Sequence, residues 1–232
     1  MTAPPSAIAS GTKLRGWIDP RHTALFVIDT QVDFASPVGA VARSGADLRA
    51  IPAALAAASR LAAAARRAGA TVVFVRLETR PETDSPAWAE RMRRRGGVPE
   101  IDAALCRAGT SGADFYGTAP AEGDLTVVKG RYSAFFDTSL DAILKARGVD
   151  TLVVCGLTTD CCVDCTVRDA FHLDYHVFLA ADACAGYDEP LHDAALASLG
   201  HNFAILLSAA AVATAWAARG EMAVELDEGM QR

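Results

Sequence analysis

Three segments of the sequence end in side chains whose chemistry fits together. The run TALFVID ends in Asp29, LTVVK ends in Lys129, and TLVVC leads through a short turn to Cys162. A cysteine attacks as its thiolate, and a nearby ammonium or a helix amino terminus favours that anion. A carboxylate beside the thiol can accept its proton and return it to a leaving amine. We therefore expect Lys129 to hold Cys162 near the thiolate form and Asp29 to transfer the proton.

The elements that must position these side chains alternate along the chain. Short apolar runs predict strands over residues 23–29, 71–77, 125–129, 151–155, 175–180 and 202–207, and helical patterns fall at 51–68, 138–147, 160–172, 191–200 and 208–218. Strands that are apolar on both faces and alternate with helices are typical of a parallel sheet covered on both sides. Sites in such sheets form beyond the carboxyl ends of the strands. The sequence thus predicts a three-layer α/β/α domain with all three side chains at one edge.

Composition limits the class of protein. The chain has 232 residues, of which 51% are hydrophobic, and a net charge of −6, which argues against nucleic acid as a partner. Its apolar runs are shorter than the roughly 18 residues of a membrane helix. The start lacks the basic and apolar pattern of an export signal, so we expect a cytoplasmic protein with reduced thiols. We expect one domain over residues 21–218, an extended N-terminal arm over 1–20 and a flexible C-terminal tail over 219–232.

The stretch 78–123 interrupts the alternation and is rich in Pro, Gly and Arg. A long irregular segment inside a compact domain usually serves a site or forms a lid. It carries the basic cluster Arg91, Arg93, Arg94 and Arg95, which indicates a solvated face or, as the alternative, an anion-binding segment. Cys162 and Cys165 have the spacing of a redox or zinc pair, but neither a second pair nor matching histidines accompany them.

Three motifs carry a resemblance to a known family. They are VIDTQVDF at 27–34, VKGRYSAF at 128–135 and GLTTDCCVDCTVRDA at 156–170. The chain resembles the isochorismatase-like cysteine hydrolases over about residues 20–215. The resemblance implies a six-stranded parallel sheet in the order 3-2-1-4-5-6, with Asp29, Lys129 and Cys162 as the catalytic residues. In this alignment the nucleophile is Cys162 and not Cys161 or Cys165.

The resemblance also implies roles around the nucleophile. A cis peptide bond between Leu157 and Thr158 would direct the N–H groups of Thr158 and Cys162 at a developing oxyanion. Phe34 and Tyr132 would line the substrate pocket. Glu78, at the end of the second strand, would bind a substrate N–H or a water molecule. The alternatives are that Phe34 belongs to the core and that Glu78 is a solvated loop acid.

The expected reaction follows the nearest branches of the family, the ureidoacrylate and N-carbamoyl amidohydrolases and biuret hydrolase. No histidine follows the second strand, where nicotinamidases bind a metal, so we expect no metal and no other cofactor. We expect cleavage of the C–N bond of a small ureido, carbamoyl or carboxamide substrate through a thioester, with release of ammonia or an amine. The alternatives are an isochorismatase-type vinyl-ether hydrolase and a non-catalytic domain that binds a metabolite or partner. We expect a homodimer or homotetramer that binds neither nucleic acid nor membrane.

Overall fold

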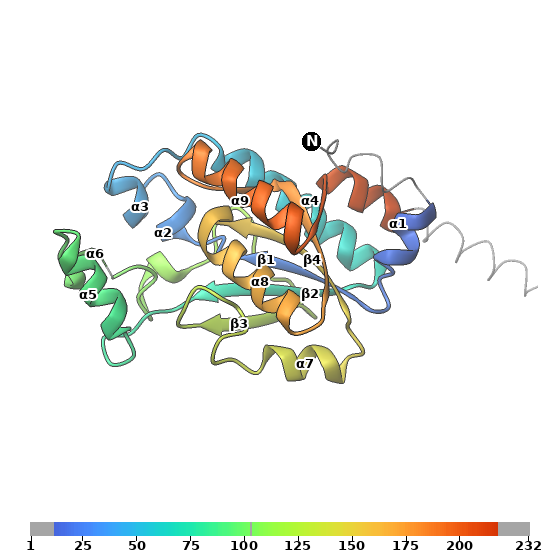
Figure 1. Cartoon of the computed structure of the whole chain (residues 1–232), viewed down its shortest axis with the longest axis horizontal. Coiled ribbons are helices and arrows are strands. Elements are labelled where there is room, and N and C mark those ends of the chain that lie inside the picture. The colour runs from blue at the N-terminus through green and yellow to red at the C-terminus, as the bar shows by residue number, and fades with distance from the viewer. Residues whose placement is uncertain (1–11, 103, 218–232) are drawn as a thin grey trace, which may run out of the picture.

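The fold is built on one parallel sheet. A computed structural model of the protein describes residues 12–102 and 104–217 and contains six strands in the order β3-β2-β1-β4-β5-β6 (Figure 1). The strands are β1 (Thr23–Ile28), β2 (Thr71–Leu77), β3 (Leu125–Lys129), β4 (Thr151–Leu157), β5 (His176–Ala185) and β6 (Ile205–Leu207). Every neighbouring pair is parallel. The predicted strand order is confirmed.

Helices fill the connections between the strands. They are α1 (Thr12–Trp17), α2 (Val32–Ala35), α3 (Ala40–Arg43), α4 (Ile51–Ala68), α5 (Pro86–Arg94), α6 (Pro99–Asp102), α7 (Leu140–Ala146), α8 (Asp164–His172) and α9 (Glu189–Asn202), with one more helix over residues 209–217. Helix α4 has the predicted bounds and ends at Gly69, whose left-handed φ of 77° suits glycine at a helix terminus. Right-handed connections place α4 and α8 on opposite faces, because the chain moves from β1 to β2 in one direction and from β4 to β5 in the other.

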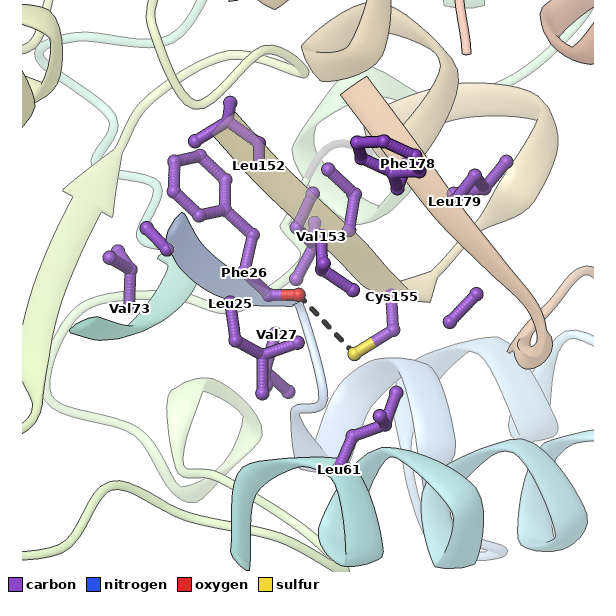
Figure 2. Packing of buried hydrophobic residues seen from close by; sticks show 14 of the residues in the cluster. Leu25, Phe26, Val27, Leu61, Val73, Leu152, Val153, Cys155, Phe178 and Leu179 are labelled. Atoms are coloured by element: carbon purple, nitrogen blue, oxygen red, sulfur yellow. Dashed lines mark hydrogen bonds between the residues drawn. The ribbon is translucent and has the colours of Figure 1, made fainter. Parts of the chain in front are cut away.

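The two central strands form the core. All residues of β1 and β4 are buried, as expected for strands covered on both faces. Figure 2 shows Leu25 and Val27 of β1 and Leu61 of α4 in this packing. The Cys155 thiol donates to the carbonyl oxygen of Phe26 at 3.3 Å, so this cysteine serves the core. The side chains at the carboxyl ends of β1 and β4 are therefore carried by the most enclosed part of the sheet.

The first described residues do not form the expected extended arm. Residues Thr12–Trp17 form α1, and Leu14 and Ile18 are buried against the core. The Trp216 indole N–H donates to the Ile18 carbonyl oxygen at 2.8 Å, which attaches this segment to the last described helix. The apolar spacing of Leu14 and Ile18, one helical turn apart, explains the difference. The rest of the expected arm, residues 1–11, and the expected tail, 219–232, lie outside the described residues.

The stretch between β2 and β3 contains more helix than the sequence predicts. Helix α5 begins after Ser85, whose Oγ accepts from the Trp88 N–H at 3.2 Å, and Pro86 occupies its first turn. Figure 1 places α5 and α6 beyond the arrowheads of the strands, on the same side as α2 and α3 and opposite α1. This stretch thus faces the carboxyl edge of the sheet. Within the described ranges, no helix combines the length and apolar character that crossing a bilayer requires.

Candidate active site

Asp29 stands where β1 turns away from the sheet. Its N–H still donates to the Val75 carbonyl oxygen at 2.9 Å, while its φ of 49° lies in the left-handed region. Aspartate tolerates this conformation better than most residues other than glycine. The side chain is only 1% exposed. The turn therefore fixes a buried carboxylate at the carboxyl end of a central strand.

Lys129 ends β3 and reaches across β2 to this carboxylate. Its Nζ donates to Asp29 Oδ2 at 2.7 Å and to the Arg131 carbonyl oxygen at 3.0 Å. The lysine is 1% exposed, so the ion pair is fully enclosed. Buried pairs of this kind are strongly coupled, because neither charge has water as an alternative partner. Asp29 Oδ1 has no hydrogen-bond partner among the residues that the structure describes. One carboxylate oxygen is thus engaged and the other is available as a proton acceptor.

Cys162 lies in a wide helical turn between β4 and α8. The Val163 N–H donates to the Thr158 carbonyl oxygen at 3.1 Å, five residues back, so residues Thr159–Val163 form a π-helical turn. The sequence predicted an ordinary helix from Asp160, and α8 begins only at Asp164. The Thr166 hydroxyl donates to the Cys162 carbonyl oxygen at 2.7 Å and accepts from the Ala134 N–H at 3.1 Å. Thr166 thereby ties the cysteine turn to the segment that follows Lys129.

A glycine allows the acid and the cysteine to approach. Gly156, near the end of β4, has a φ of 123°, and a Cβ there would lie 2.2 Å from the Ile28 carbonyl oxygen. No other residue fits, because the backbones of β1 and β4 touch at this point. Ile28 precedes Asp29, and Gly156 begins the turn that carries Cys162. The expected cis peptide bond between Leu157 and Thr158 is present in that turn.

The three side chains interact electrostatically. Burial raises the pKa of Asp29, and the charge of Lys129 and contact with the Cys162 thiol offset part of that rise. Burial alone would lower the pKa of Lys129, but attraction to Asp29 and to the Cys162 sulfur raises it above its usual value. The pairing with Asp29 therefore favours the charged form of Lys129. Burial also makes Asp29 a stronger base than an exposed aspartate.

The surroundings of Cys162 favour its thiol form. Contact with Cys161, burial and the charge of Asp29 raise the pKa of Cys162 well above its usual range, although Lys129 acts in the opposite direction. These electrostatics run against the expectation that Lys129 keeps the sulfur anionic in the resting protein. The reason is that Asp29 engages the ammonium directly at 2.7 Å.

A cavity of about 520 Å³ opens beside the cysteine turn. Its lining includes Leu77, Trp88, Arg91, Tyr132, Asp160 and Cys161. Cys162 itself is 6% exposed, and the two residues that precede it, Asp160 and Cys161, belong to this lining. A larger cavity of about 700 Å³, lined by Trp17, His176 and Phe203 among others, lies at the amino ends of β4 and β5. The smaller cavity is the candidate site, because Leu77 at the end of β2, Gly130 next to Lys129 and Cys161 next to Cys162 line it at the carboxyl edge of the sheet.

The three predicted substrate-binding residues lie in different environments. Tyr132 is 40% exposed and lines the cavity, with its ring centroid 6.3 Å from that of Trp88. Phe34 is half-buried against Leu77 and Leu157, in agreement with the alternative that it belongs to the core. The Glu78 carboxylate forms ion pairs with Arg76 and Arg80. Tyr132 is thus the one of the three that the cavity lining includes.

Two positioning residues in the first motif escaped the sequence analysis. The Gln31 side chain is buried; it donates to the Leu77 carbonyl oxygen and accepts from the Leu77 N–H, both at 2.8 Å. The Asp33 carboxylate accepts from the Cys106 N–H at 2.8 Å and from the Ala40 N–H at 3.0 Å. Both residues bind the loop after β1 to the stretch after β2. In the sequence, the one indication of these roles was the presence of polar residues between apolar ones in the motif at 27–34.

The histidines and cysteines show no arrangement for a metal. Among residues 12–102 and 104–217, no group of three or more His, Cys, Asp or Glu side chains is placed to hold an ion. His192 Nδ1 lies 2.8 Å from the Thr159 hydroxyl, so that histidine supports the cysteine turn. All six cysteines are free thiols.

The three-layer parallel fold and the acid, lysine and cysteine at its carboxyl edge define an isochorismatase-like cysteine hydrolase. The profile of the isochorismatase domain matches residues 23–211, and the chain therefore belongs to the isochorismatase family.

Sequence relatives and solved structures agree with this assignment. The chain is 39% identical over 196 residues to a ureidoacrylate amidohydrolase, RutB, from Methylobacterium radiotolerans, and this match covers 78% of the chain and 74% of the relative. A cysteine hydrolase from Pseudomonas syringae pv. phaseolicola has a TM-score of 0.76 at 28% identity and covers 87% of this chain and 95% of its own. N-carbamoylsarcosine amidase from Thermoplasma acidophilum has a TM-score of 0.63 at 27% identity, and the match covers 81% of this chain and 96% of the amidase.

Proposed function

We propose that this hydrolase cleaves the C–N bond of a small ureido, carbamoyl or carboxamide compound, with Cys162 as the nucleophile. The observation that carries the proposal is the enclosed ion pair, in which Lys129 Nζ lies 2.7 Å from Asp29 Oδ2 in electrostatic contact with the Cys162 sulfur. The amide chemistry in the names of two relatives, a ureidoacrylate amidohydrolase and an N-carbamoylsarcosine amidase, supports the reaction class.

The first half of the reaction forms a thioester. Asp29 Oδ1 accepts the thiol proton while the sulfur attacks the carbonyl carbon, and the electron pair of the C=O bond moves onto oxygen. The N–H groups of Thr158 and Cys162 are the proposed donors to that oxyanion. When the C–N bond breaks, protonated Asp29 gives its proton to the departing nitrogen, so ammonia or an amine leaves neutral. Lys129 keeps its charge throughout.

The second half restores the thiol. Water attacks the thioester carbonyl as Asp29 accepts one of its protons, and the C–S bond then breaks. The sulfur leaves with its electron pair and regains the proton from Asp29. The products are a carboxylic or carbamic acid and the free enzyme. Asp29 thus serves as base and acid in each half, which suits a carboxylate whose pKa burial has raised.

An ammonia-release screen over ureido and carboxamide compounds tests this proposal, with wild type compared to Cys162→Ala. We expect Cys162→Ala to lose turnover by a factor of about 10³ or more while unfolding at the wild-type denaturant concentration. Cys165→Ala is the matched control, because Cys165 lies one turn further along and is a free thiol; we expect it to keep wild-type turnover. Normal turnover by Cys162→Ala would end the assignment.

Alkylation separates the amidase from the two alternatives. Iodoacetamide should inactivate an amidase through modification of Cys162, whereas an acid-catalysed vinyl-ether hydrolase would stay active after the same modification. A non-catalytic binding domain would turn over no compound before or after treatment. Mass spectrometry of the modified protein identifies the alkylated residue.

We further propose that the protein works in the cytoplasm as a homodimer or homotetramer. The six free thiols suit a reducing compartment. Analytical ultracentrifugation of the purified chain measures the number of subunits.

A further inference from the structure

Helix α5 carries two side chains that line the cavity and that the proposed chemistry does not use. Trp88 and Arg91 are three residues apart and therefore share one face of the helix. Both line the cavity of about 520 Å³. This volume suits a small molecule, whose orientation a few polar groups would fix. The two residues are candidates for that task.

Trp88 supplies an unused hydrogen-bond donor. Its Nε1 is buried and has no hydrogen-bond partner in the part of the chain that the structure describes. Buried indole N–H groups usually have an acceptor, because a buried donor that has lost its water partner is unfavourable when it stays unpaired. The ring packs edge-on against Tyr132 at an interplanar angle of 81°. A ligand oxygen would complete this site.

Arg91 supplies a positive charge that is not paired within the protein. The neighbouring Arg94 and Arg93 form ion pairs with Glu90 at 2.9 Å and 3.5 Å. In contrast, no described carboxylate forms an ion pair with Arg91. The guanidinium also acts on the cavity: its charge lowers the pKa of Tyr132, against a larger rise caused by burial. Arg91 is thus the member of the basic cluster whose charge reaches the cavity interior.

The cavity lining carries opposite charges in different places. Asp160 and Cys161 line the end next to the nucleophile, whereas Arg91 and Trp88 line the part formed by α5. Arg131 also lines the cavity, but its guanidinium donates to the Gly130 carbonyl oxygen at 2.7 Å and to the Thr83 carbonyl oxygen at 3.1 Å. An anionic group would be repelled by Asp160 and attracted by α5, while a neutral N–H group would be favoured near Asp160.

We propose that Trp88 and Arg91 bind a carboxylate of the substrate, in the part of the cavity that α5 lines. One carboxylate oxygen accepts from the Trp88 indole N–H and the other from the Arg91 guanidinium. This inference rests on the proposed function and narrows it to ureido or carboxamide compounds that also carry an acid. Arg91 and Trp88 are specificity-determining residues, since neither takes part in bond making or breaking.

Binding to an inactive variant tests the inference without turnover. In the Cys162→Ala background, isothermal titration calorimetry compares ureidoacrylate with its uncharged methyl ester. We expect the acid to bind about tenfold or more tightly than the ester, because charge-assisted hydrogen bonds are about twice as strong as neutral ones. Adding Arg91→Gln should weaken binding of the acid by about tenfold and leave the ester unchanged. Adding Trp88→Phe, which keeps a ring and removes the N–H, should weaken binding of the acid several-fold.

Arg94→Gln is the matched control, because Arg94 lies on the same helix and pairs with Glu90. It should change binding of neither compound. An acid that binds no better than its ester, or an equal loss for both compounds in Arg91→Gln, would overturn the inference. Absence of binding by both compounds would overturn it as well. Failure of the proposed function is a separate result, because it shows as unchanged ammonia release in Cys162→Ala.

Discussion

The proposed catalytic trio and helix α5, which lines the cavity beside the cysteine turn, are built in different ways. The proposed trio, Asp29, Lys129 and Cys162, is at most 6% exposed and is held by strand ends, a glycine contact and an ion pair. The cavity wall, defined as Trp88, Arg91 and Tyr132, stands on α5 and the loop after β3; Arg91 and Tyr132 are exposed and Trp88 is half-buried. The trio thus depends on the core for its geometry, whereas the wall can change with little effect on the sheet.

This difference predicts that substitutions in the ion pair of the trio, Asp29 and Lys129, affect stability and turnover together. The largest effect should come from Lys129→Met, which leaves the Asp29 carboxylate buried without its partner. Breaking a buried pair in this way is destabilising by about 3–5 kcal/mol. Urea denaturation measures the loss, and turnover should disappear. The double variant Asp29→Asn, Lys129→Met should recover much of the stability and none of the activity. A single variant as stable as wild type would contradict the enclosed ion pair.

The contact between β1 and β4 should give the next largest effect. Gly156→Ala would place a Cβ 2.2 Å from the Ile28 carbonyl oxygen, so the strands must separate. We expect a loss of about 2 kcal/mol or more in the free energy of unfolding. Gly123→Ala is the matched control, because Gly123 has a φ of 89° with no atom within 4 Å of its added Cβ. Equal losses in the two variants would show that backbone conformation alone matters at Gly156.

The third prediction concerns the resting state of the nucleophile. Because the charge of Asp29 contributes to the raised pKa of Cys162, Asp29→Asn should lower that pKa while Lys129 stays charged. The thiolate fraction then rises at a given pH, and the midpoint of the alkylation rate against pH should move down. Iodoacetamide labelling of Cys162 over a pH series, followed by mass spectrometry, measures the shift against wild type. A midpoint that moves upward would contradict the assigned electrostatics.

The smallest effect should come from Glu78, outside both the trio and the wall. Its carboxylate is paired with Arg76 and Arg80, so Glu78→Gln removes ion pairs at a half-buried site and no substrate contact. We expect the free energy of unfolding to fall by about 1 kcal/mol and KM to stay close to the wild-type value. A tenfold rise in KM at constant kcat would instead restore Glu78 as a substrate-binding residue.

The contrast between the buried sheet and the loops around it also explains which features could be predicted from the sequence. Buried strands such as Thr71–Leu77 and the helix Ile51–Ala68 were predicted with their observed bounds, because apolar period and a terminal glycine define them locally. Convergence of Asp29, Lys129 and Cys162 at one edge follows from parallel topology. The hydrogen-bond and ion-pair partners of individual side chains could not be predicted from the topology. Glu78 meets two arginines through the path of a loop, which no spacing rule describes.

Residues that act through long-range contacts were also out of reach. Gln31 and Asp33 bind backbone groups between 7 and 82 residues away along the chain. The basic cluster 91–95 was visible in the sequence, but only the structure separates Arg91, which lines the cavity, from Arg94, which pairs with Glu90. The π-helical turn before α8, over Thr159–Val163, has no recognisable local signal in the sequence.

The bond from the Trp216 indole to the Ile18 carbonyl oxygen joins two residues that are 198 positions apart. The segment after α1 and the last described helix therefore hold each other in place, and the two ends of the described part of the chain lie side by side. New termini opened in an exposed loop, with a linker across the old ones, should preserve the sheet. Shortening the chain ahead of Trp216 should instead uncover Leu14 and Ile18 and loosen the first helix.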